Sequence, residues 1–169
     1  MTELSLQQIN IKAPYQVVCG GSIGMFKFVS DSNVVFGVAF EKDDLLQTCV
    51  SYQFAVTNYE GKRSPRDSKV RETIVAIVEE FFIKNQAALL YICETGDGMQ
   101  RMRNRLFRSW FGVYRENDAY LYLPMTVFDE DDNENYAALI LRKDHPHFKE
   151  IVSEFTMAVN ILNDKPEDL

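Results

Sequence analysis

The residues from 52 to 93 change their hydrophobic period twice, and this change constrains the fold more than any other feature of the sequence. Residues 52–59 alternate polar and apolar side chains, which predicts a strand with one covered face. Residues 65–83 carry apolar side chains three or four positions apart, which predicts an amphipathic helix. Residues 88–93 form a continuous apolar run, typical of a strand covered on both faces. The order predicts a right-handed β-α-β unit with parallel strands.

The remaining segments extend this unit into a larger layer fold. Strands are predicted at 25–29 and 34–40 around a turn at 30–33, and residues 15–19 are a further candidate strand. Two more helices are predicted at 98–111 and 146–162, and two more strands at 119–128 and 136–142. Because Pro124 has no backbone N–H, its strand is expected at a sheet edge or at a bulge. The predicted fold is α+β, with a single mixed, largely antiparallel sheet and about three helices.

Local signals locate the first long helix and its core. Ser64 is expected to be its N-cap, with Pro65 at the first helical position and Asp67 completing a pattern like a capping box. The side chains predicted for the core are Val70, Ile74, Ile77, Phe81, Leu90, Ile92, Leu106, Trp110, Phe148, Ile151 and Phe155. Met99 and Met102 share the predicted buried side of the helix at 98–111, and Leu162 shares that of the last helix.

Length and charge exclude several classes of protein. The 169 residues predict one domain, with a loose segment at 1–14 and a tail at 163–169. The 18 Lys and Arg against 25 Asp and Glu give a net charge of −7, which argues against a protein that coats nucleic acid. No signal peptide and no run of eighteen apolar residues is seen, so no membrane partner is expected. Cys19, Cys49 and Cys93 fit no disulfide framework, which predicts a reducing, cytoplasmic location.

Three motifs carry a resemblance to a known family. They are D-S-K-V-R-E-T-I…F-F at 67–82, L-Y-I-C-E at 90–94 and R-N-R-L-F-R-S-W-F at 103–111. In this order they resemble a family of small bacterial proteins with a domain of unknown function, and the similarity extends from about residue 25 to residue 162. The resemblance implies no activity.

A looser resemblance is to the general N-acetyltransferase superfamily, in the order of strands and helices. It implies an N-acetyltransferase-like layout, with a coenzyme A site at the start of the helix at 65–83. It also implies a tyrosine at position 107 that donates a proton as the general acid. Small residues let backbone N–H groups approach a pyrophosphate, but residues 63–68 contain Pro65 and no glycine. Position 107 is Phe107, which cannot donate a proton.

Arginine is unusually concentrated on one predicted helix of this acidic chain. Arg101, Arg105 and Arg108 fall at i, i+4 and i+7, so they form one exposed stripe. The stripe is either a solvated face paired with neighbouring carboxylates or a surface that binds a partner. Arginine suits an acidic protein or an anionic small ligand, because its planar fork grips carboxylate and phosphate with two donors.

A second candidate site lies where the two parallel strands end. Parallel strands deliver the following helix starts to the same sheet edge, the usual ligand position in open α/β sheets. Backbone N–H groups at Gly96 and Gly98, with the side chains of Arg63 and Arg66, are candidates for binding an anion there. A capped helix start and a tight turn would equally explain the glycines.

No metal or cofactor site and no catalytic group is predicted. The spacing of acidic and amide residues at 129–133 is similar to the start of a calcium-binding loop. The sixth position of such a loop requires glycine, however, and here it is Glu134. His145 and His147 have no metal-ligand spacing to a cysteine or carboxylate. We therefore expect a non-catalytic interaction or regulatory module. The alternatives are a divergent acyl-CoA-dependent N-acetyltransferase and a binder of anionic small ligands; the oligomeric state is not predicted.

Overall fold

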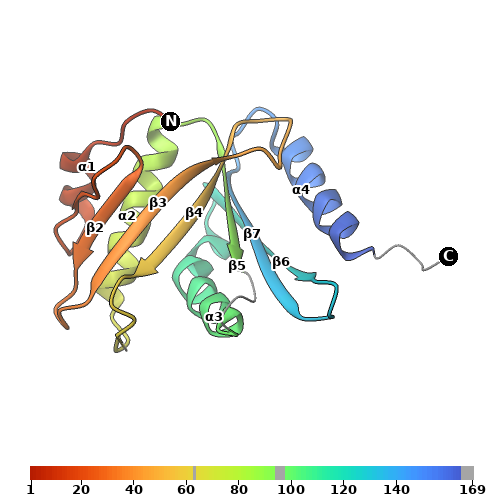
Figure 1. The fold of residues 1–169 in the computed structure, drawn as a ribbon. Helices are drawn as coiled ribbons and strands as arrows, with labels where there is room; N and C mark the ends of the chain where they lie inside the picture. The colour runs from red at the N-terminus through yellow and green to blue at the C-terminus, as the bar shows by residue number, and fades with distance from the viewer. Residues whose placement is uncertain (63, 94–97, 165–169) are drawn as a thin grey trace. The chain divides into compact units, whose positions relative to one another are not determined.

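The computed structural model describes residues 1–62, 64–93 and 98–164 of an α+β fold (Figure 1). Its strands form one mixed seven-stranded sheet in the order β1-β2-β3-β4-β5-β7-β6. The strands are β1 (Val18–Cys19), β2 (Met25–Val29), β3 (Val35–Asp43), β4 (Ser51–Asn58), β5 (Ala88–Cys93), β6 (Tyr120–Phe128) and β7 (Glu134–Arg142). The helices are α1 (Leu6–Lys12), α2 (Ser68–Lys84), α3 (Gln100–Phe111) and α4 (Phe148–Asn163), with a 3₁₀ helix η1 (Gly112–Glu116).

Strand pairing confirms the predicted mixture of directions. β4 and β5 are parallel, with Ser51 opposite Ala88 and Gln53 opposite Leu90. The described pairings of β1 with β2, β2 with β3, β5 with β7, and β6 with β7 are antiparallel. Pro124 lies in β6, the last strand of the sheet, as its missing N–H requires.

The described residues contain four α-helices, against about three predicted. The additional helix is α1, which begins after the N-cap Ser5 and buries Ile9 inside the segment predicted to be loose. With only seven residues it is too short to show a hydrophobic period. No helix in the described ranges is both long enough and apolar enough to cross a membrane.

The predicted N-cap of α2 is wrong. Asp67, not Ser64, is the cap: its backbone is extended, and its carboxylate accepts a 2.9 Å hydrogen bond from the N–H of Lys69. Both residues have a side-chain oxygen that suits an N-cap, but a carboxylate also interacts favourably with the positive end of the helix dipole. The chain therefore enters the helix three residues later than expected.

The chain divides into two compact units, and the first comprises residues 1–42 and 54–86. Its core is aromatic: the ring of Phe40 stacks on Phe81 at a centroid distance of 4.8 Å and lies 5.5 Å from the ring of Phe54. The predicted core positions of α2, from Val70 to Phe81, are all buried. Such rings exclude a large apolar area from water, which makes them the main stabilising contacts of this unit.

Tyr15 connects the N-terminal segment of this first unit to the start of α2. Its hydroxyl donates a hydrogen bond to the carboxylate of Asp67 and accepts one of 3.1 Å from the N–H of Asp31. Burial, followed by the bond to Asp67, raises the pKa of Tyr15. Lys69 completes the arrangement with a 2.8 Å ion pair to Asp31. The helix cap, Tyr15 and the turn that follows β2 therefore share one hydrogen-bonded network.

The second unit comprises residues 43–53 and 87–169, and its described helices α3 and α4 cover opposite faces of the strand group β5-β7-β6. Side chains alternate along a strand, so Leu90 and Leu139 face one side while Tyr91 faces the other. Leu90 and Leu139 pack with Ile151, Phe155 and Val159 of α4, and Phe148 is partly buried against the same cluster. Tyr91 packs on α3 instead.

Among the apolar side chains predicted to be buried in this unit, Ile92 and Leu162 are exposed, as are Met102 and Leu106 of α3 and its N-cap residue Met99. Ile92 is 38% exposed because it lies beyond the α4 cluster, close to the end of β5. Leu162 is 57% exposed in the last turn of α4, past Val159, the last buried residue of that helix.

Glu154 of α4 connects that helix to the loop before β4. Its carboxylate accepts hydrogen bonds from the N–H groups of Gln47, at 2.5 Å, and Thr48, at 3.1 Å. Burial would raise the pKa of Glu154, but the N–H of Gln47 and the contacts with Thr48 outweigh it and lower the pKa. The ionised carboxylate is therefore the form that stabilises this packing.

We predict that Glu154→Gln lowers the free energy of unfolding by about 1–2 kcal/mol, because it removes the negative charge and replaces one of the two accepting oxygens by an NH2 donor. A native pKa below the ordinary value of 4.5 means that the stabilisation is complete above pH 4.5 and is lost as the pH falls through the native pKa. Urea unfolding at several pH values should show the difference from the wild type shrinking below pH 4.5. Glu130→Gln is the control, since Glu130 is exposed; a difference that persists in acid would contradict the assignment.

Candidate partner-binding surface

Aromatic packing fixes which side of α3 faces the sheet. The ring of Phe107 stacks on Tyr91 at a centroid distance of 3.6 Å and an interplanar angle of 12°. Phe107 also contacts Phe111, at 4.6 Å, and lies 6.5 Å from Trp110. All three α3 side chains are buried, with exposed fractions of 8% or less. The opposite side of the helix must then face solvent.

The predicted rotation of α3 is therefore partly wrong. Trp110 is buried as expected, but Leu106 is 47% exposed and Met102 is 58% exposed, while Phe107 occupies the core position. The helix has two apolar rows, and only one of them packs on the strands. The aromatic row is buried because large rings exclude more apolar area from water and stack on Tyr91.

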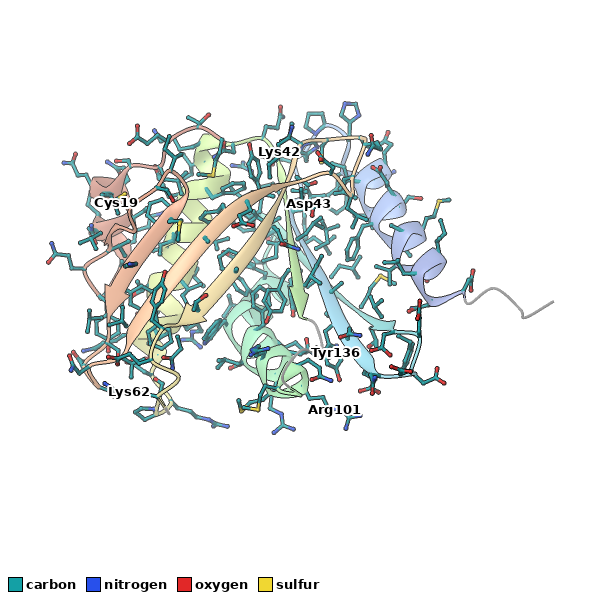
Figure 2. All side chains as sticks on the ribbon, viewed as in Figure 1. Cys19, Lys42, Asp43, Lys62, Arg101 and Tyr136 are labelled. Atoms are coloured by element: carbon teal, nitrogen blue, oxygen red, sulfur yellow. The ribbon has the colours of Figure 1, made fainter. Side chains whose placement is uncertain are left out.

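The three predicted partner-binding arginines do share one exposed stripe of α3. Arg101, Arg105 and Arg108 line a shallow groove between the helix and β7. The other residues of the groove are Asn104, Glu134 and Tyr136. Figure 2 shows Arg101 and Tyr136 at the same end of this unit. The groove therefore combines three cations with a single carboxylate.

Glu134 is the acidic centre of this groove. Its Oε2 lies 3.2 Å from Nη2 of Arg101 and accepts a 2.7 Å hydrogen bond from the hydroxyl of Tyr136. The hydrogen bond to Glu134, followed by burial, raises the pKa of Tyr136. Glu134 thus occupies one arginine and one hydroxyl that an external carboxylate would otherwise contact.

Sequence reasoning did not identify Glu134 and Tyr136 as groove residues. Positions two apart on a strand point to the same face, and this signal was present in the sequence. Their partner Arg101 lies on a different element, however, and no local pattern gives that pairing.

Arg105 and Arg108 are the available cations of the groove. In the described part of the chain, neither has an ion pair or a side-chain hydrogen bond. A guanidinium group offers several N–H donors in a rigid fork that matches a carboxylate. Two such groups one helical turn apart can hold carboxylates spaced along an acidic segment.

The structure does not test the predicted sheet-edge anion site. Arg63 and Gly96 lie outside the described residues. Arg66 and Gly98 are exposed, and they belong to different units of the chain. This site stays a prediction.

The acidic hairpin at 129–134 is held by its own side chains. The carboxylate of Asp129 accepts hydrogen bonds from the N–H groups of Asp131, at 3.0 Å, and Asn133, at 2.9 Å. These bonds stabilise the turn between β6 and β7. Among the residues that the structure describes, no three His, Cys, Asp or Glu side chains are placed to hold a metal ion.

Comparison with protein families gives one match. A family model described as a family of unknown function (DUF6169) covers residues 66–157, which include all three sequence motifs. No curated protein matches the chain.

Truncating neighbouring residues of α3 tests the observed rotation of this helix. We predict that Phe107→Ala lowers the free energy of unfolding by about 3–5 kcal/mol, because it opens a cavity beneath Tyr91. Leu106→Ala should change it by less than about 1 kcal/mol, because that side chain is half-exposed. Chemical denaturation of both variants measures the difference. Equal losses would mean that both apolar rows are packed and that the arginine stripe is turned elsewhere.

Proposed function

We infer the function of this chain from its own surface, because the chain belongs to the DUF6169 family, a family of unknown function. We propose that it is a non-catalytic interaction module and that Arg101, Arg105 and Arg108 bind an acidic segment of a partner protein. The observation that carries the proposal is the groove between α3 and β7, in which Arg105 and Arg108 have no acidic partner among the residues that the structure describes.

Charge favours a protein over a nucleic acid as this partner. The chain carries a net charge of −7, so a groove with three arginines is an unusually cationic part of an acidic protein. Glu134 and the nearby residues 129–132 add carboxylates at the same end of the unit. Such carboxylates repel a continuous phosphate backbone, whereas a short acidic peptide can avoid them.

The N-acetyltransferase-like layout and an acyl-CoA activity belong to the alternative proposal. The parallel pairing of β4 with β5 supports the layout. Phe107 argues against acetyl transfer, because it is a buried ring stacked on Tyr91 and has no acidic proton to donate. We also propose a cytoplasmic location, supported by the free thiols of Cys19 and Cys49.

Replacing the three arginines tests the proposal. The probe is a fluorescently labelled glutamate-rich peptide, whose binding is followed by anisotropy. We predict that Arg101→Gln, Arg105→Gln and Arg108→Gln together weaken binding at least tenfold, because each arginine supplies a charge-assisted hydrogen bond. Binding to the wild type should also weaken from 0.1 to 1 M salt, as the Debye length falls from about 10 Å to about 3 Å.

A matched variant separates the groove from the overall charge. Lys42→Gln, Lys84→Gln and Lys149→Gln remove three exposed cations elsewhere, so both triple variants carry −7 − 3 = −10. Equal loss in the two variants would reduce the effect to net charge and refute the groove. Saturable binding of inorganic phosphate without peptide binding would support the small-anion alternative instead.

Glu134 should act as an internal competitor for the partner's carboxylates. We predict that Glu134→Gln strengthens binding of the glutamate-rich peptide several-fold, because it releases Arg101 and removes a like charge from the groove. Glu130→Gln makes the same charge change in the exposed hairpin and should have a smaller effect. If the two variants bind the peptide equally, Glu134 does not compete for Arg101.

A further inference from the structure

The second apolar row of α3 lies beside the arginine stripe on the exposed side of the helix. Met102 is 58% exposed and Leu106 is 47% exposed, and Val113, in η1, continues the row at 50%. Met102 and Leu106 are four positions apart, so they are neighbours on the helix surface. We name Met102 and Leu106 the apolar row.

The apolar row and the arginines form one continuous surface. With 3.6 residues per turn, successive residues are about 100° apart around the helix axis. Seen from Met102, Arg105 therefore lies about 60° away in one direction and Leu106 about 40° away in the other. Arg101 and Arg108 follow on the far side of Arg105. Arg103 is also exposed and borders the apolar row on the side of Leu106, about 60° beyond it, but it has an interaction within the chain, whereas Arg105 and Arg108 have none among the described residues.

We propose that the acidic partner is an amphipathic helix that lies along α3, with its own apolar row against Met102 and Leu106. Its acidic flank then faces Arg105 and the groove beyond it. This inference rests on the proposed function and adds the secondary structure and the apolar row of the partner.

The geometry favours a helix over an extended peptide. α3 has 12 residues and is about 18 Å long, so a partner helix of similar length can lie along it and contact the apolar row, which spans about one turn, and the arginines, which span about two. Helices pack ridges of residues four apart into the grooves of a neighbour, and Met102 with Leu106 makes such a ridge. An extended strand spaces the side chains of one face about 6.8 Å apart, against a rise of about 6 Å from Met102 to Leu106, so it matches the apolar row less closely than a helix does.

The charges also select one flank of the partner. An apolar row in isolation would fit many surfaces, but a partner lying on Met102 and Leu106 brings one of its flanks over Arg105. Asp or Glu on that flank would pair with the arginines, whereas Lys would be repelled. The partner should therefore show apolar residues at i, i+3 or i+4, and i+7, with carboxylates beside them on one side.

Two labelled peptides of identical composition test this inference. One is an 18-residue amphipathic helix with leucines in a single row and glutamates along one flank; the other scatters the same leucines around the helix. We expect the amphipathic peptide to bind at least tenfold more tightly than the scattered peptide. Met102→Gln with Leu106→Gln should abolish that difference and leave the affinity for the glutamate-rich peptide unchanged.

Controls make the outcomes separable. Met157→Gln with Ile161→Gln alters two exposed apolar residues of α4 and should not change the preference. Circular dichroism and the thermal midpoint confirm that each variant is folded. Equal affinity for the two peptides, with continued dependence on the arginines, would overturn the amphipathic helix and leave the proposed function standing. Binding of neither peptide nor the glutamate-rich probe would overturn both.

Discussion

The stacking of Phe107 on Tyr91 determines which side of α3 is exposed to solvent. A helix with apolar side chains on two rows can pack with either row inward, and the two choices differ by a rotation about the helix axis. The Tyr91 ring lies 3.6 Å from Phe107, and the neighbouring Phe111 and Trp110 are buried with it. This one contact therefore fixes Arg101, Arg105 and Arg108 on the outside and places Met102 and Leu106 next to them.

Most strands and the three long helices follow from the sequence, because their signals are local. Alternation at 52–59 and the apolar run at 88–93 predict β4 and β5, and their parallel pairing follows from the helix between them. Pro124 marks the edge strand through its missing N–H. α1 escaped prediction because a helix of two turns leaves too few positions to define a period.

The candidate site could be predicted only in part. The spacing of the arginines places them on one face, and charged side chains seldom lie in a core. The rotation of α3 could not be read from periodicity, since Leu106 and Phe107 are both apolar and adjacent in sequence. The groove depends on Glu134 approaching Arg101 from another element, which is a tertiary contact without a local signal. The sheet-edge site at Arg63, Arg66, Gly96 and Gly98 stays a prediction, because Arg63 and Gly96 lie outside the described residues and the other two belong to different units.

The hydrogen bond between Tyr15 and Asp67 indicates that the segment that folds with α2 begins well before the helix itself. The family match starts at residue 66, one position before the residue that caps α2. The hydroxyl that binds this cap comes from residue 15, and the ring of Phe40, which stacks on Phe81, comes from β3. A fragment cut to residues 66–157 would keep the motifs that define the family but lose these contacts and expose the buried face of α2. The segment that identifies the chain as a family member is thus shorter than the segment that must fold together.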